Sequence, residues 1–275
     1  MSAPALSAEA LAVWEDMARL WDDTIADGNG YWKCLQEPAL GRFLGEHLAR
    51  PSCRALDLAT GNGLCARWLV SKGASFVLAT DGSENMLERA RGRMVPGRDD
   101  AIVLRKLDVT QAADFDALLL RNEPPFDVVL INMAIMDIAT LDPLVRALPK
   151  LLAKDGVFAA SVLHPVFFTS GASKNLDIRP NPETGEMEVV RTKVIKNYLF
   201  IPPVKGEAFR GQPRKQIYFH RPMHELFAVF FKTGLVMDAM EEPAFTNENY
   251  NPERVDDHSN YTQLPAILAW RMRLA

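Results

Sequence analysis

The stretch that decides the fold of this chain is Arg54-Ala55-Leu56-Asp57-Leu58-Ala59-Thr60-Gly61-Asn62-Gly63. Its first half is a short apolar run, which predicts a buried strand, and Gly61 and Gly63 end that run in a turn. A helical pattern follows from Leu64 until Gly73 ends it. A turn with so little side chain lets backbone N–H groups approach a ligand, and the helix N-terminus adds a partial positive charge. The stretch therefore predicts a strand–turn–helix unit that binds a ligand at its turn.

Two cofactor classes use a turn of this kind, and a plain turn without a ligand is the third interpretation. Gly61 to Ala66 fits the G-x-G-x-x-G/A fingerprint of dinucleotide binding, with Asp81 downstream for a ribose. Asp57 to Gly63 instead resembles the D-x-G-x-G-x-G motif of proteins that bind S-adenosylmethionine, with Ala59 in the first glycine position. Asp57 would face a pyrophosphate unfavourably, whereas S-adenosylmethionine offers an ammonium group and no phosphate. Charge therefore favours S-adenosylmethionine.

Length, composition and charge exclude several other classes of partner. The 275 residues are 48% hydrophobic and 24% charged, which is enough to bury a sizeable core. The net charge of −4 provides no basic field for nucleic acid, and no apolar run approaches the roughly 20 residues that a bilayer helix needs. We expect a cytoplasmic protein without a nucleic-acid or membrane partner. The three cysteines are far apart and lack C-x-x-C spacing, so neither a disulfide nor a metal site is predicted.

Further apolar segments repeat the strand–helix rhythm of the first unit. Four more strands are predicted, at residues 76–81, 102–109, 126–132 and 156–163. Continuous apolar strands that alternate with helices predict a parallel sheet covered on both faces, with its ligand outside the carboxyl ends of the strands. The polar residues at those ends are Asp57, Asp81, Asp108, Asn132 and His164.

Together these segments resemble the ordered motifs of the class I S-adenosylmethionine-dependent methyltransferases. The matching stretches are Asp57 to Gly63, Thr80-Asp81-Gly82-Ser83 with Met86, Leu107-Asp108-Val109, and Phe126-Asp127-Val128-Val129. The resemblance implies a Rossmann-like α/β fold with a seven-stranded sheet and helices on both faces, closed by an antiparallel hairpin of Val236–Met240 and Ala266–Leu274. It also implies cofactor contacts at Asp57, Ala59, Gly61, Gly63, Asp81, Gly82, Met86, Asp108, Val109, Asn132 and Met133.

The chain is expected to divide into four parts. These are an N-terminal helical lid at residues 1–50, the cofactor-binding core at 51–165, an inserted substrate lid at 166–216, and a C-terminal helix and hairpin at 217–275. The insert is rich in proline and has a strand-like segment at residues 187–200, which predicts a hairpin above the ligand. Surface decoration or a contact in a homodimer are the alternatives. Tyr31 and Trp32 are expected to cover the ligand, whereas Trp14 and Trp21 are expected to pack on the core.

The expected reaction is transfer of a methyl group from S-adenosylmethionine to an oxygen or nitrogen of a small organic molecule. A proton acceptor would assist, and the candidates in order are His164, His220 and Asp137. The residues expected to contact the substrate are Tyr31, Trp32, Asp137 and Tyr218. Two other functions stay open, an NAD(P)-dependent oxidoreductase and an S-adenosylmethionine-binding fold that catalyses a non-methylating rearrangement.

Overall fold

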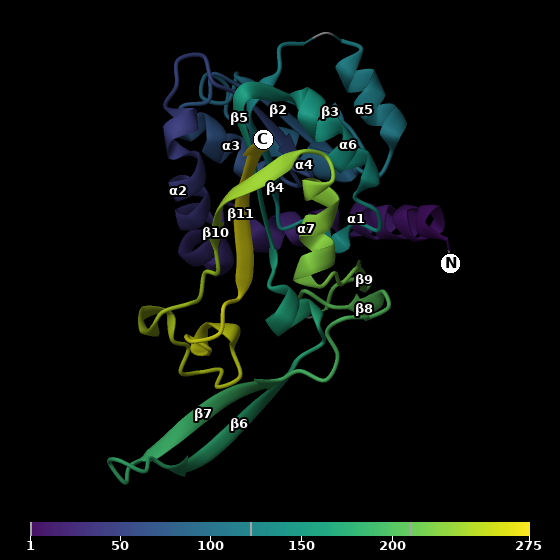
Figure 1. Ribbon diagram of the computed structural model, residues 1–275. Helices are drawn as coiled ribbons and strands as arrows, with labels where there is room; N and C mark the ends of the chain where they lie inside the picture. The colour runs from purple at the N-terminus through teal and green to yellow at the C-terminus, as the bar shows by residue number, and fades with distance from the viewer. Residues whose placement is uncertain (1, 122, 210) are drawn as a thin grey trace.

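A seven-stranded sheet runs through the centre of the molecule in the order β10-β11-β5-β4-β1-β2-β3 (Figure 1). The computed structural model describes residues 2–121, 123–209 and 211–275. Strands β1 to β5 are parallel, while β11 runs antiparallel to both β5 and β10. The predicted sheet and its closing antiparallel hairpin are confirmed. The strands are β1 (Arg54–Leu58), β2 (Phe76–Asp81), β3 (Ile102–Lys106), β4 (Phe126–Asn132), β5 (Leu152–Leu163), β10 (Leu235–Glu241) and β11 (Ile267–Leu274).

Helices cover both faces of this sheet, and the side-chain alternation of the strands explains why. Leu56 and Leu58 of β1 join the hydrophobic core on one face, whereas Ala55 joins the core on the other. The first core is covered by α5 (Ala112–Leu119), α6 (Asp142–Leu151) and α7 (Met223–Phe231), and the second by α2 (Glu37–Leu48) and α3 (Leu64–Ser71). Both faces are therefore buried, as continuous apolar strands require.

The N-terminal helix α1 (Ala3–Ile25) is attached to the carboxyl edge of the sheet. It packs against α4 (Glu84–Arg93), where the Glu15 carboxylate accepts hydrogen bonds from the Ser83 hydroxyl (3.0 Å) and the Glu84 N–H (2.9 Å). Near the C-terminal end of α1, the Asn62 side-chain amide donates to Asp22 Oδ1 and to the Ala26 carbonyl, both at 3.0 Å. Hydrogen bonds therefore attach the C-terminal end of α1 to the glycine turn and the middle of α1 to the start of α4. A short π-helix (Trp32–Gln36) then leads into α2.

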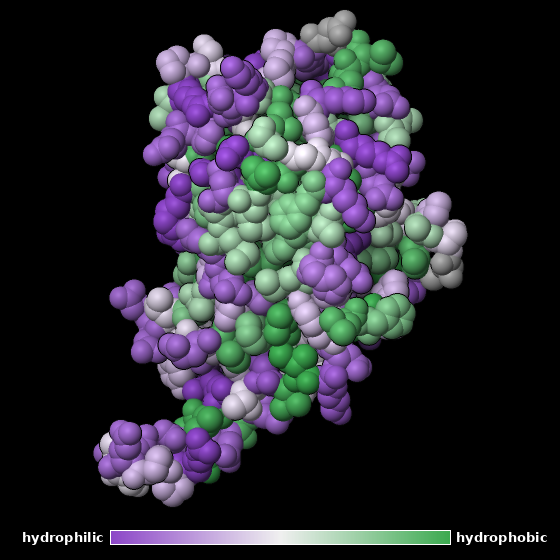
Figure 2. Space-filling model, in the orientation of Figure 1, coloured by the Kyte–Doolittle hydropathy of each residue, from purple (hydrophilic) through white to green (hydrophobic). Residues whose placement is uncertain are grey.

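The segment inserted after β5 has two parts that lie in different places. Strands β6 (Ser173–Pro180) and β7 (Met187–Val194) form an antiparallel hairpin, called the arm here, which projects away from the body (Figure 1). Its visible face is mostly hydrophilic (Figure 2). The second part, β8 (Val204–Gly206), pairs with β9 (Gln216–Tyr218) beside the body. The hairpin was expected above the ligand, and its predicted second strand extended to residue 200. In the structure that strand ends at Val194 and the arm points outward.

The remaining described elements are single turns. They are the 3-10 turns η2 (Ile135–Asp137), η4 (Asn247–Asn249) and η5 (His258–Asn260) and the π-helical turn η3 (Pro165–Thr169). None of the helices in the described ranges is both long and apolar enough to cross a bilayer.

Candidate functional site

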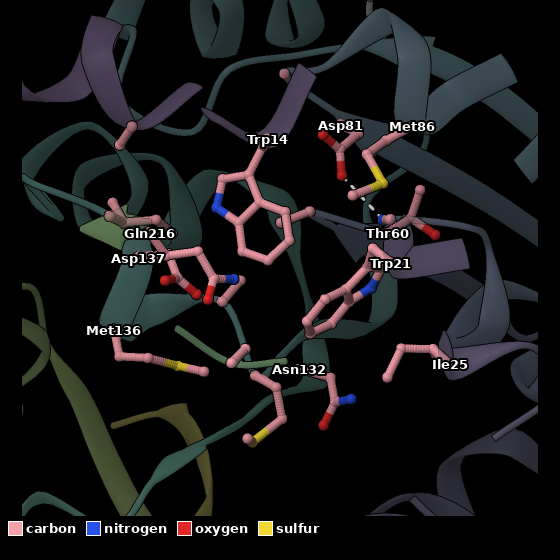
Figure 3. A pocket seen from close by; sticks show the side chains of 18 of the residues that line it. Trp14, Trp21, Ile25, Thr60, Asp81, Met86, Asn132, Met136, Asp137 and Gln216 are labelled. Atoms are coloured by element: carbon pink, nitrogen blue, oxygen red, sulfur yellow. Dashed lines mark hydrogen bonds between the residues drawn. The ribbon is translucent and has the colours of Figure 1, made fainter. Parts of the chain in front are cut away.

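A cavity of about 440 Å³ lies at the carboxyl edge of the parallel strands (Figure 3). Its floor is made by the turn after β1 and the ends of β2 and β4, and helix α1 passes over it. The loop at residues 207–209 and strand β9 complete the wall. The cavity therefore occupies the place where a doubly wound sheet binds its ligand. It has two ends, a glycine-turn end around Gly61 and Asp81 and a second end around Asp137.

The backbone of the glycine turn is left-handed at three positions. Gly61 and Gly63 have φ of +57° and +76°, which glycine adopts freely. A Cβ at Gly63 would lie 3.2 Å from the Ala90 Cβ, so this glycine allows the turn to pack closely on α4. Ala59, which stands where the motif has its first glycine, also takes a positive φ of +53°. An alanine in this region costs roughly 1–2 kcal/mol, so the turn holds strained backbone at the site.

Two buried carboxylates brace this turn from below. Asp81 accepts hydrogen bonds from the Gly61 N–H and the Ser83 N–H, both at 2.9 Å (Figure 3). Asp57 accepts a hydrogen bond from the Thr60 hydroxyl. Burial raises the pKa of Asp81 to about 6 and that of Asp57 to about 7, because the charged form loses its hydration. The two acids therefore lie in a setting where an added positive charge would be stabilising.

The other predicted cofactor residues also border the cavity. Gly82, Met86 and Val109 line it. The Asp108 carboxylate accepts from the Thr110 N–H (2.9 Å) and from the Thr110 hydroxyl (2.8 Å), which fixes its orientation. The structure therefore brings the ends of three successive strands, β1, β2 and β3, to one ligand surface.

Asn132 and Met133, at the end of β4, lie on the floor of the cavity. The Asn132 amide donates to Gln36 Oε1 at 2.8 Å and its carbonyl oxygen accepts from the Ser161 hydroxyl at 2.6 Å. These bonds orient the amide and tie the π-helical segment to the sheet. Met133 has a left-handed φ of +53°. Gln36 gave no signal in the sequence because its partner is 96 positions away.

Trp14 and Trp21 of α1 form the roof of the cavity, whereas Tyr31 and Trp32 were expected to cover the ligand. The rings of Trp14 and Trp21 meet edge to face, 4.9 Å between centroids, and both line the cavity (Figure 3). Tyr31 and Trp32 border the cavity too, but Trp32 is only 4% exposed. It packs on Trp68 at 5.8 Å. The expectation that Trp14 and Trp21 only pack on the core is wrong, because α1 crosses the edge of the sheet instead of covering its face.

The second end of the cavity is built by η2 and β9. The Asp137 carboxyl group lies beside Gln216 in Figure 3, and Asp137 is only 7% exposed. Its Oδ1 is buried without a hydrogen-bond partner among the described residues, and burial raises the pKa of this carboxyl group well above its ordinary value. Tyr218 lines the same end, and its hydroxyl donates to Gln216 Oε1 at 2.9 Å. This end therefore combines an unpaired acid with a phenol and an amide.

Neither of the two predicted histidines lines the cavity. His164 is 1% exposed, and its Nε2 contacts Glu242 Oε1 at 2.8 Å while its Nδ1 accepts from the Val166 N–H at 3.2 Å. His220 contacts the Thr169 hydroxyl through Nδ1 and donates to the Tyr198 carbonyl through Nε2. Both nitrogens of each ring are therefore occupied away from the cavity. The geometry does not support either histidine as the proton acceptor, and it leaves Asp137 as the predicted candidate that reaches the ligand space.

Among the described residues, no metal site or disulfide lies at this cavity. Across residues 2–121, 123–209 and 211–275, no group of His, Cys, Asp and Glu is arranged to hold a metal ion. Cys34, Cys53 and Cys65 are free thiols. Cys65 lines the cavity near Asp57, and burial holds the pKa of its thiol well above the ordinary value. A thiol in that state is a poor nucleophile.

The methyltransferase domain family matches residues 56–158, the segment that contains β1 to β5 and their turns. The chain carries a class I S-adenosylmethionine-dependent methyltransferase domain. The predicted family is confirmed, and with it the assignment of the chain as an enzyme that uses this cofactor.

Solved structures of methyltransferases share the fold of nearly the whole chain. An S-adenosylmethionine-dependent methyltransferase from Mesorhizobium loti has a TM-score of 0.60 at 24% identity, covering 90% of this chain and 99% of that one. The CcbJ methyltransferase of Streptomyces caelestis has a TM-score of 0.58 at 18% identity, with coverage of 96% and 98%. The glycopeptide N-methyltransferase MtfA, solved with S-adenosylmethionine, has a TM-score of 0.52 at 13% identity, with coverage of 86% and 93%. No curated protein matches the sequence.

Proposed function

We propose that this methyltransferase transfers a methyl group from S-adenosylmethionine to a nitrogen or oxygen atom of a small organic molecule. One observation carries the proposal. The cavity extends from the glycine turn to Asp137 beneath α1, and its volume of about 440 Å³ is in the range of small-ligand sites. The two tryptophans and the loop at 207–209 line the space between the two ends, which suits a small acceptor.

The glycine-turn end fits S-adenosylmethionine by shape and by charge. Around Gly61, a Cβ would meet only Trp21 Nε1 at 3.8 Å, so the backbone of the turn faces open space. The Asp57 carboxyl, whose pKa burial raises, would be stabilised by the cofactor ammonium. Asp81 has one further lone pair on each oxygen for ribose hydroxyl groups, and Asp108 and Val109 lie where an adenine would be recognised. These residues would hold the cofactor.

The protein contributes alignment and exclusion of water. When bound, S-adenosylmethionine supplies an electrophilic methyl group on a sulfonium leaving group. Holding the acceptor in line is worth about 7–11 kcal/mol, whereas a proton acceptor adds about 10²–10⁴-fold. The parts that would align the acceptor and exclude water are the floor at Asn132, the roof at Trp14 and Trp21, and the carboxyl group of Asp137 at the far end.

The acids at the glycine-turn end also separate this proposal from the oxidoreductase alternative. A nicotinamide dinucleotide would bring a pyrophosphate to a turn that has the Asp57 carboxyl group beneath it. At close range in a partly buried site, a carboxylate and a pyrophosphate repel each other. S-adenosylmethionine places no phosphate there. We therefore expect no binding of nicotinamide dinucleotides.

The proposal is tested by titrating S-adenosylmethionine, and separately NADH and NADPH, into the purified protein by calorimetry. Mass spectrometry of gently purified protein adds a check for a nucleoside retained during purification. We expect binding of S-adenosylmethionine at a one-to-one ratio and none of either dinucleotide. Binding of a dinucleotide without binding of S-adenosylmethionine would overturn the proposal.

A further inference from the structure

We propose that the methyl acceptor is an amine, which binds with its cationic nitrogen against the Asp137 carboxylate. This inference rests on the proposed function and narrows it from nitrogen or oxygen to nitrogen. It starts from the charges on the cavity wall, of which the proposed cofactor explains only some.

The described lining of the cavity contains five acids and no lysine or arginine. Its one histidine, His258, is held neutral because burial and neighbouring lysines lower its pKa to about 3. Three of the acids lie at the glycine-turn end, where the cofactor would meet them. A fourth, Glu207, is exposed and lies 3.8 Å from the Lys215 ammonium group. Among the described residues, Asp137 is thus the acid of the lining that neither the cofactor end nor a cation accounts for.

Arg221 contacts the backbone on both sides of Asp137 but makes no described bond to the Asp137 carboxyl group. Arg221 is buried, and its guanidinium donates to the carbonyl oxygens of Ile135 (3.1 Å), Ile138 (2.7 Å) and Ala139 (3.1 Å). These bonds hold the backbone of η2 on both sides of Asp137 without neutralising its carboxyl group. The turn is therefore a fixed platform that presents an unpaired carboxyl to the cavity. Burying such a group is unfavourable unless a partner supplies the missing charge and hydrogen bonds.

The surroundings of Asp137 suit an organic ammonium group. Trp14 and Tyr218 line the same space, and Figure 3 places the Trp14 indole between Asp137 and Asp81. Aromatic faces attract cations, and the attraction grows when water is excluded. An anionic acceptor at this end would be repelled by the Asp137 carboxylate, and a neutral alcohol would leave that carboxylate without a cationic partner. An amine satisfies both the charge and the apolar wall.

Asp137 would also take the proton that the acceptor nitrogen must lose. An ammonium group has no lone pair, so an N–H bond breaks and an O–H bond forms on the carboxylate, leaving a neutral amine and a neutral carboxylic acid. The nitrogen lone pair then forms the N–C bond to the methyl carbon, and the electron pair of the broken C–S bond remains on sulfur. The product leaves as the methylated ammonium ion, and the carboxylic acid returns its proton to water. Burial, which favours the neutral acid, assists this proton transfer.

Three probes of matched shape test this proposal by calorimetry in the presence of saturating S-adenosylhomocysteine. They are phenethylamine, which is cationic, 2-phenylethanol, which is neutral, and phenylacetate, which is anionic. We expect the amine to bind the wild-type protein about tenfold or more tightly than the alcohol, as a charge-assisted hydrogen bond requires, and no binding of the acid. In Asp137→Asn, which has nearly the same shape, the amine and the alcohol should bind within about threefold of each other.

The control is Asp142→Asn, which removes the same charge from an exposed position at the start of α6 and should retain the amine preference. Equal binding of the amine and the alcohol in the wild type, a preference that persists in Asp137→Asn, or no binding of the amine at millimolar concentration would each overturn the inference. Binding of S-adenosylhomocysteine is measured first in all three proteins. Its absence from the wild type would count against the proposed function, whereas its presence without an amine preference would count against the inference alone.

Discussion

The two ends of the cavity both contain buried acids, but the acids differ in their hydrogen-bond partners. At the glycine-turn end, Asp81 accepts two backbone N–H bonds and Asp57 accepts the Thr60 hydroxyl. At the other end, Asp137 Oδ1 has no partner within the described ranges. The first pair is part of the structure even without a ligand, whereas the carboxyl of Asp137 is completed only by something that binds. In the proposed function, the first end holds the cofactor and the second end selects the acceptor.

The largest effect is expected from Asp81→Ala, which removes the carboxylate from the cofactor end. This change removes charge-assisted hydrogen bonds to the ribose and releases the Gly61 N–H that shapes the turn. A loss of about 1.5–3 kcal/mol corresponds to a fall in S-adenosylmethionine affinity of about ten- to hundredfold. Calorimetry measures it, with Asp116→Ala on the exposed side of α5 as the control. Unchanged affinity in a folded Asp81→Ala protein would remove Asp81 from the site.

His164→Ala is expected to affect stability more than turnover. The buried ring links Glu242 to the Val166 N–H beneath η3, so its loss leaves a void and an unsatisfied donor worth about 1–3 kcal/mol. Thermal unfolding measures this cost. Because the ring does not reach the cavity, turnover should fall by about tenfold or less, below the 10²–10⁴-fold typical of a lost proton acceptor. A larger fall, with unchanged stability and cofactor affinity, would restore His164 as the base.

Asp137→Asn is expected to change stability in a pH-dependent way. Burial raises the pKa of Asp137 above its unfolded value of about 3.9, so its charge destabilises the folded state above that pH. This penalty is largest above the folded pKa and vanishes as the pH falls below the unfolded value of about 3.9, because the group is then protonated in both states. The melting temperature of Asp137→Asn minus that of the wild type should therefore be higher at pH 8 than at pH 4. A difference independent of pH would show that the carboxyl is not an unpaired charge.

The smallest effect is expected from shortening the arm. Leu176 and Arg191 are directly paired across β6 and β7, so the residues between them can be replaced by a two-residue Asn-Gly turn. Ile178 and Met187 in the removed part are 68% and 65% exposed and line no part of the cavity. Melting temperature and S-adenosylmethionine affinity should stay unchanged. A fall in either would mean that the outer arm contributes to the core or to the site.

The parts of the site that the sequence located are those whose partners are close along the chain. Asp57 and Thr60 are three positions apart, and Asp81 contacts Ser83 two positions on, so motif spacing encodes the geometry directly. The fold was predicted for the same reason, since each strand carries its own apolar run and ends at its own polar residue. The sequence therefore predicts the geometry that residues close together along the chain determine.

The parts of the site that the sequence did not locate depend on the direction of side chains and on packing between distant segments. Leu163 borders the cavity but the next residue, His164, points away from it, because successive positions of an extended chain alternate. Trp14 and Trp21 were expected to pack on the core, but the sequence of a helix does not tell whether its apolar face meets a core or a ligand. Gln216 reaches the second end only because β9 pairs with β8 beside the body. None of these arrangements has a local signature.

The most direct test of the two-ended cavity is a crystal structure of the protein with S-adenosylhomocysteine. We predict that the adenosine lies between Asp81 and Asp108, that the amino group of the homocysteine faces Asp57, and that the sulfur is directed along the cavity toward Asp137. A nucleoside bound at the Asp137 end, or outside the cavity, would contradict the account.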